Sequence, residues 1–156
     1  MKNKFLEKRD KKDCNGCGIC ALLCPVDAIN MAEDKEGFLY PEINEDKCIK
    51  CNKCKNVCSN FNNQNLYKEK SFAGYTKNSQ DLQECSSGGI FYILAKYVIQ
   101  NDGVVFGAKF NEQLKVEHDY AETLIECKKF RGSKYVRSDV KNSYIKVKEF
   151  LENNRT

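Results

Sequence analysis

The chain has 156 residues, of which 41% are hydrophobic and 31% charged, and this composition is typical of a soluble globular protein rather than a disordered one. Its formal net charge is +4, with scattered lysines and no arginine-rich stripe of the kind that binds nucleic acid. The first residues are charged throughout, unlike a signal peptide, and the longest apolar region, 90–99, is too short to cross a bilayer. We therefore expect a cytoplasmic protein with no membrane span and no nucleic-acid partner, whose ten cysteines are kept reduced.

Eight of the ten cysteines form two runs with the same spacing, C-x2-C-x2-C-x3-C. The first run is Cys14, Cys17, Cys20 and Cys24, and the second, thirty-four positions later, is Cys48, Cys51, Cys54 and Cys58. This spacing is typical of thiolates that bind [4Fe–4S] clusters, and the fourth cysteine of each run ligates the other cluster. The predicted ligand sets for two [4Fe–4S] clusters are therefore Cys14, Cys17, Cys20 with Cys58, and Cys48, Cys51, Cys54 with Cys24.

Glycines in the first run support this prediction. Gly16 and Gly18 can adopt a positive φ and bring backbone N–H groups close to sulfur, and in the corresponding places of the second run we expect Asn52 and Lys53. The alternatives are structural zinc and disulfides. Zinc sites usually pair C-x2-C knuckles across a longer gap, so two tandem four-cysteine runs favour iron–sulfur clusters.

The segment around the two runs has few apolar residues. A segment of this size cannot build a sufficient core, so the clusters would have to supply it and the apoprotein would fold poorly. Between the runs, the short apolar pieces 28–31 and 38–40 flank the polar residues 33–37, which predicts a hairpin. Residues 1–60 are thus expected to form an α+β domain, and this segment resembles the two-cluster bacterial ferredoxins.

Residues 61–70 are polar and asparagine-rich, as in a linker, and 71–156 form a second region. Strands are predicted at 71–76, at 104–110 and, from the alternation of apolar residues, at 114–120. Helices are predicted at 90–100, after the capping box 123–126, and at 140–151. The fold class is therefore a ferredoxin-like α+β dicluster domain followed by a partial α/β domain.

Two loops of the second region are candidate anion sites. The segment Ser86–Gly89 precedes a helix and could hold a phosphate on backbone N–H groups, although a serine N-cap with small packing residues is the more common reason for such a segment. The cations Arg131, Lys134 and Arg137 could hold an anionic cofactor or form a solvated loop. We interpret His118 as a packed histidine, and no residue stands out as an acid–base catalyst.

Three segments of the second region, added to the two cysteine runs, carry a resemblance to a known family. They are Ser86–Phe91 (SSGGIF), Gly103–Ala108 (GVVFGA) and Phe130–Val136 (FRGSKYV). The chain resembles the beta subunits of coenzyme F420 hydrogenases and dehydrogenases over nearly its whole length. The serine–glycine and Gly-Ser-Lys-Tyr segments are more particular to that family than the cysteine runs are.

The resemblance implies a flavin, usually FAD, in the second region, which exchanges electrons with the clusters. The implied flavin-binding residues are Ser87, Gly88, Gly89, Gly132, Ser133 and Lys134. It also implies a redox partner protein, such as a ferredoxin or a hydrogenase or dehydrogenase subunit.

Members of that family continue beyond the position of Thr156 with the rest of the flavin pocket. We therefore expect this chain to correspond to the amino-terminal portion of such a protein and to retain little FAD. The first interpretation is an electron-transfer protein within a flavin-linked oxidoreductase. The second is a dicluster ferredoxin module that docks a redox partner without flavin, and the third is a zinc-stabilised interaction protein. Whether the chain itself catalyses a reaction is left open between the first two.

Overall fold

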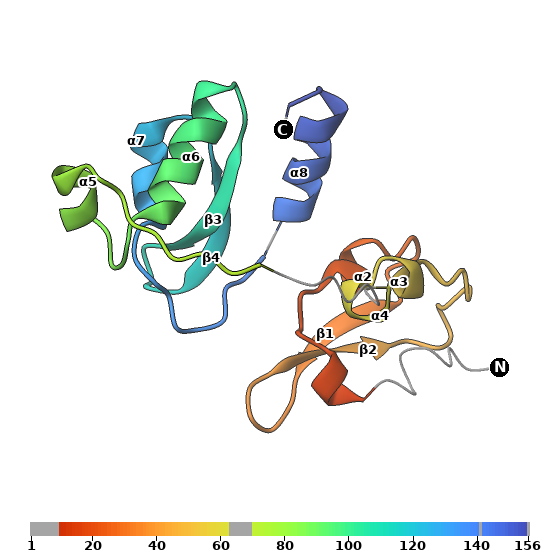
Figure 1. Ribbon diagram of the computed structural model, residues 1–156. Coiled ribbons are helices and arrows are strands. Elements are labelled where there is room, and N and C mark those ends of the chain that lie inside the picture. Colours follow the sequence, from red (N-terminus) through yellow and green to blue (C-terminus); the bar gives the residue numbers. More distant parts are fainter. Residues whose placement is uncertain (1–9, 63–69, 141, 156) are drawn as a thin grey trace. The chain divides into compact units, whose positions relative to one another are not determined.

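The computed structural model describes residues 10–62, 70–140 and 142–155. The chain divides into two compact units, residues 1–68 and 69–156, which are called the first and second unit below (Figure 1). Most of the predicted linker 61–70 lies outside the described residues. Among the helices that the structure describes, none combines the length and apolar character that crossing a membrane requires.

The first unit combines short helices with one small sheet. Its elements in order are η1 (Lys11–Asp13), α2 (Ile19–Leu22), β1 (Ile29–Glu33), β2 (Leu39–Ile43), α3 (Lys53–Asn56) and α4 (Ser59–Asn62). The two strands form an antiparallel hairpin in which Ile29 is opposite Ile43 and Glu33 is opposite Leu39. Asp34 closes the turn because its carboxylate accepts hydrogen bonds from the backbone N–H groups of Glu36 and Phe38. The predicted hairpin is therefore confirmed.

Few hydrophobic side chains are buried in the described part of the first unit. They are Ala28, Cys54 and Cys58, and two of these three belong to the cysteine runs. Helices α2 and α3 pack against each other, and α2 also contacts β1. The interior of this unit is thus built around the cysteine loops rather than around large apolar side chains.

The second unit has a two-stranded antiparallel sheet with helices on both faces (Figure 1). Its elements are α5 (Ser79–Gln83), α6 (Ile90–Gln100), β3 (Val105–Phe110), β4 (Val116–Ala121), α7 (Leu124–Cys127), η2 (Lys128–Phe130) and α8 (Ser143–Glu152). Alternate residues of β3 face opposite ways: Gly107 lies under the ring of Phe130, while the ring of Phe106 contacts that of Phe150 in α8. The core consists of the buried residues Ala95, Val105, Ala121, Cys127 and Phe130.

The structure confirms several predicted elements of this unit. Helix α6 forms where predicted, β3 and β4 pair as a hairpin, and Thr123 and Glu126 form the capping box of α7. The apolar face predicted for α6 from its helical period is wrong, because Ile93, Leu94 and Tyr97 are exposed and the helix packs on the core through Ala95, Val98 and Ile99. The predicted strand 71–76 is wrong, because this segment has no regular secondary structure and joins neither described sheet, and its Phe72 is 91% exposed. Strand β4 also begins later than predicted, since Leu114 lies in the preceding turn with a φ of 59°.

Candidate functional site

The two cysteine runs fold into the same local structure. Helix α2 follows Gly18 and helix α3 follows Asn52, both in the left-handed conformation and at the same offset as the cysteines. Two positions before these caps, Gly16 and Lys50 also have a positive φ, of 66° and 56°. Each loop therefore turns twice through the left-handed region, which lets the backbone wrap around the thiols of its run.

One expectation for the second run needs correction. Asn52 occupies the expected left-handed position, but Lys53 is the first residue of α3 and the other left-handed residue is Lys50. The turn is thus made without glycine in this run. Asparagine tolerates the left-handed conformation well, whereas lysine adopts it at a cost in backbone energy.

Four cysteines from both runs line one cavity in the first unit. These are Cys24 of the first run and Cys48, Cys51 and Cys54 of the second. The cavity contains about 310 Å³ of space not filled by atoms, open solvent included, and its other lining residues include Pro25, Val26 and Ile29. The fourth cysteine of the first run thus meets the first three of the second.

The Cys24 sulfur has a hydrogen-bond donor of its own. The backbone N–H of Ala28, a buried residue directly before β1, donates to Cys24 Sγ over 3.2 Å. Backbone N–H groups that donate to sulfur in this way stabilise cysteine ligands of metal clusters. The bond also fixes the direction in which the sulfur points.

The remaining four cysteines of the two runs are Cys14, Cys17, Cys20 and Cys58. Burial raises the pKa of the Cys20 thiol to about 11, and the nearby thiols of Cys17, Cys14 and Cys54 add to this effect. Cys58 is buried, and the segment after it is tied to the start of the first run, because Asn60 Nδ2 donates to the carbonyl oxygen of Asp13 over 2.8 Å. The end of the second run therefore reaches the residue next to Cys14.

These thiols suit iron–sulfur clusters. Each cubane takes four cysteine thiolates, and the described residues offer a cavity with four thiols drawn from both runs, together with left-handed loops and a donor to sulfur. Within residues 10–62, 70–140 and 142–155, no three His, Cys, Asp or Glu side chains converge on a position for a single metal ion. A cubane is instead capped at four separate iron corners.

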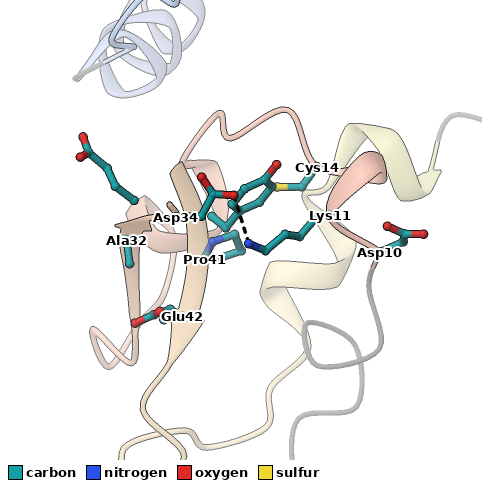
Figure 2. Close-up of a pocket in the computed structure, with 9 residues that line it drawn as sticks. Asp10, Lys11, Cys14, Ala32, Asp34, Pro41 and Glu42 are labelled. Carbon is teal, nitrogen blue, oxygen red and sulfur yellow. Dashed lines mark hydrogen bonds and ion pairs between the residues drawn. The ribbon is translucent and has the colours of Figure 1, made fainter. Parts of the chain in front are cut away.

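A second cavity in the first unit lies beside Cys14 (Figure 2). Lys11 of η1 forms an ion pair with Asp34 across it, at 3.1 Å, and the Lys11 ammonium lies 4.6 Å from the centre of the Tyr40 ring. Burial tends to raise the pKa of Asp34, but hydrogen bonds from Lys11 and from backbone N–H groups outweigh burial and lower that pKa. These contacts hold η1, and with it the start of the first run, against the β1–β2 hairpin.

The second unit has a cavity that collects most of the predicted flavin-binding residues. Ser87, Gly88, Gly89, Gly132 and Ser133 all line it, although they come from segments more than forty positions apart. Gly88 has no room for a side chain, because a Cβ there would lie 2.4 Å from the carbonyl oxygen of Gly74. The N-cap of α6 is Gly89 without a side-chain cap, so the interpretation of this segment as a serine N-cap is wrong.

Lys134, the sixth predicted residue, does not line this cavity. Its ammonium donates to the carbonyl oxygens of Phe130 and Arg131, at 3.0 and 2.9 Å, and burial lowers its pKa. The cation that does line the cavity is Arg131, whose side chain is 10% exposed. Arg131 forms an ion pair with Glu84 and lies over the Tyr92 ring at 4.1 Å, while its Nε has no hydrogen-bond partner among the described residues.

Comparison with known proteins identifies the first unit and not the second. Residues 13–62 match the family described as a 4Fe-4S dicluster domain, and this match includes both cysteine runs. It spans less than half of the chain. No curated protein matches the chain. The chain therefore contains a dicluster iron–sulfur domain, whereas the resemblance of the second unit to F420 hydrogenase beta subunits stays a prediction.

Proposed function

We propose that the chain is an electron-transfer protein whose first unit holds two [4Fe–4S] clusters with exchanged fourth ligands. The observation that supports this proposal is the cavity in which Cys24 joins Cys48, Cys51 and Cys54. The corresponding set is Cys14, Cys17 and Cys20 with Cys58, supported by the bond from Asn60 to Asp13. The eight thiolates bind iron, and the clusters supply one-electron redox chemistry when bound.

The protein contributes orientation and shielding to this chemistry. The left-handed residues Gly16, Gly18, Lys50 and Asn52 shape the two loops, and the N–H of Ala28 stabilises negative charge on Cys24 Sγ. The hairpin β1–β2 separates the two runs in sequence yet leaves α2 and α3 in contact. Each run therefore completes the ligand set of the other, and neither would form a site alone.

Anaerobic reconstitution with iron and sulfide tests this function. We expect about eight iron atoms per chain and an absorbance near 400 nm that bleaches with dithionite. Stoichiometric zinc with no visible absorbance after expression under iron-replete conditions would instead identify a zinc-stabilised interaction protein. A content of about four iron atoms would contradict the proposal of two complete sites.

We propose, as a second function, that the second unit binds a flavin and passes electrons between it and a redox partner protein. The observation that favours this proposal is the cavity that joins the segments Ser86–Gly89 and Phe130–Ser133 and carries Arg131 on its wall. The backbone N–H groups before α6 and the Arg131 guanidinium suit the phosphates of a nucleotide cofactor. Lys134 would act indirectly, because its hydrogen bonds to the carbonyl oxygens of Phe130 and Arg131 hold the loop that carries Arg131.

A titration of the chain with FAD, followed by flavin fluorescence, tests this second function. Because the chain is expected to retain little FAD, we expect quenching only at high flavin concentration, with an affinity that falls at least tenfold further in Arg131→Gln, since a buried charge-assisted contact contributes about 1.5–3 kcal/mol. The control is Arg137→Gln, which removes the same charge at an exposed arginine that does not line the cavity. No quenching by the unaltered chain would favour the dicluster module that docks its partner without flavin.

A further inference from the structure

The two cysteine runs differ in their exposure to solvent. All ten cysteines lie in the described part of the chain, and Cys51 is the exposed one among them. Its neighbours Ile49, Lys50 and Lys53 are exposed as well, and Ile49 is 60% exposed. In the first run, Cys14, Cys17, Cys20 and Cys24 are each half-buried. A cluster held by Cys51 would therefore be the one with a ligand at the surface.

The runs also differ in charge. Residues 14–24 contain no charged side chain, whereas residues 48–58 contain Lys50, Lys53 and Lys55 and no carboxylate. The ammonium of Lys55 lies 4.8 Å from the centre of the Phe61 ring, and its side chain is half-buried. Lys50 and Lys53 line the same cavity as Cys51, and no Asp or Glu does. The exposed Cys51 therefore lies between Lys50 and Lys53 in the sequence and lines the same cavity.

We propose that Ile49, Lys50, Cys51 and Lys53 form the docking surface at which the chain exchanges electrons with an acidic electron-carrier protein. This inference rests on the proposed iron–sulfur function. An exposed thiolate ligand brings the cluster closest to a partner, an exposed apolar side chain can be desolvated at the contact, and lysines around it attract a partner whose redox centre is ringed by carboxylates. One electron leaves the reduced centre and enters the oxidised one, and no covalent bond changes.

The loop of the first run lacks these features, so we place the docking surface on the second run. The loop of the first run has no cation to attract an acidic partner, and the two lysines just before it are each paired, Lys11 with Asp34 and Lys12 with Asp10. Electrostatic attraction mainly raises association rates, and it weakens as salt shortens the Debye length. Charge changes at Lys50 and Lys53 should therefore alter the rate of electron exchange and its dependence on salt.

Stopped-flow measurement of electron exchange with an acidic flavodoxin tests the surface. The variant is Lys50→Asn with Lys53→Gln, in which asparagine suits the φ of 56° at position 50. We expect its second-order rate constant to fall about tenfold at low ionic strength and to approach that of the unaltered protein in about 0.5 M salt. With the cationic oxidant hexaamminecobalt(III), the same variant should react faster. The control, Lys35→Gln with Lys77→Gln, removes the same charge at two exposed positions elsewhere.

A second readout does not depend on electron transfer. Carbodiimide cross-linking joins lysines to carboxylates in contact, so peptides cross-linked to flavodoxin should contain Lys50 or Lys53 rather than Lys35. Iron content and absorbance near 400 nm are measured on every variant. If the unaltered chain binds no iron, the proposed function itself fails. If the clusters are intact and the electron-exchange rate is unchanged by Lys50→Asn and Lys53→Gln, the docking surface is wrong but the proposed function stands. The docking surface is also wrong if these lysines bind a single-stranded DNA oligonucleotide more tightly than they bind flavodoxin.

Discussion

Cys24 and Cys58 have the same place in their runs and opposite surroundings. Cys24 is half-buried, precedes Pro25 and accepts a hydrogen bond from Ala28, whereas Cys58 is buried and precedes the helix α4. Three residues separate each of them from the preceding cysteine, which lies in the short helix α2 or α3. Cys24 lines the cavity of the second run.

The proposed exchange of fourth ligands makes a prediction about Cys58→Ala. This change should chiefly damage the cluster held by Cys14, Cys17 and Cys20, although these cysteines are about forty positions away. Electron paramagnetic resonance of the reduced protein, together with iron analysis, distinguishes one cluster from two. Cys85→Ala, outside both runs, should leave about eight iron atoms. Loss confined to the cluster of Cys48, Cys51 and Cys54 in Cys58→Ala would show that the ligands are not exchanged.

Asp119, a carboxylate on strand β4 of the second unit, is paired with two lysines. It contacts the ammonium groups of Lys129 at 2.7 Å and Lys109 at 3.0 Å. Burial tends to raise its pKa, but the hydrogen bonds from these lysines outweigh burial and lower the pKa from 3.8 to about 2. Because the folded state holds this carboxylate ionised, its contribution to stability is present above about pH 4 and lost as the pH falls towards 2.

We therefore expect Asp119→Asn to lower the free energy of unfolding at pH 7 by about 1–2 kcal/mol, allowing for the screening of a side chain that is 27% exposed. The variant should also lose less stability than the unaltered protein between pH 4 and 2. Urea unfolding followed by circular dichroism at several pH values measures both effects. If Asp119→Asn and the unaltered protein lost the same stability between pH 4 and 2, Asp119 would not be the carboxylate responsible for this pH dependence.

Strand β3 and the turn η2 approach each other unusually closely. A Cβ at Gly107 would lie 2.6 Å from Cγ of Phe130, which is shorter than van der Waals contact. Phe130 is buried, 6% exposed, and packs in the core with Ala95, Val105 and Ala121. The glycine therefore allows the aromatic ring to lie directly on the sheet, and the packing of η2 depends on it.

Gly107→Ala should destabilise the second unit by about 1–3 kcal/mol, because the ring or the strand must move to admit the methyl group. Thermal unfolding followed by near-ultraviolet circular dichroism measures the loss as a lower Tm. Adding Phe130→Leu should recover part of it, since the smaller side chain leaves room beside the new methyl group. A Tm that is unchanged in Gly107→Ala would mean that Phe130 does not cover this strand.

The two units differ in what holds their interiors together. The second unit has a core of apolar side chains from α6, both strands, α7 and η2. In the described part of the first unit, Ala28, Cys54 and Cys58 are the buried hydrophobic residues. A unit with so little apolar burial depends on its metal ligation for stability.

Removal of iron by a chelator should therefore unfold the first unit and leave the second folded. In a nitrogen–proton correlation spectrum of the apoprotein, we expect collapsed signals for residues 10–62 and dispersed signals for the core of the second unit. Restoring iron and sulfide under anaerobic conditions should recover the dispersion of the first unit. Dispersed signals throughout the apoprotein would show that the cysteine loops fold without clusters.

The sequence alone determined the features that depend on local spacing. The cysteine runs identify iron–sulfur chemistry because ligand spacing is set by the short loop around each cubane, and this prediction agrees with the family match at residues 13–62. The hairpin at Asp34, the capping box at Thr123 and the helix from Ile90 were also predictable, because turns, caps and helical periods are determined by neighbouring residues.

Only the tertiary structure decided which distant residues meet. Residues 71–76 have the composition of a strand, yet among the described residues no strand pairs with them. Strand propensity alone does not make a strand, because a strand needs a hydrogen-bonded partner. Arg131 rather than Lys134 lines the cavity beside Ser87, because the side chain of Lys134 turns back onto two carbonyls of its own loop. The exposure of Cys51 between Lys50 and Lys53 likewise depends on how α2, α3 and β1 pack, since burial is a property of the folded unit and not of the spacing.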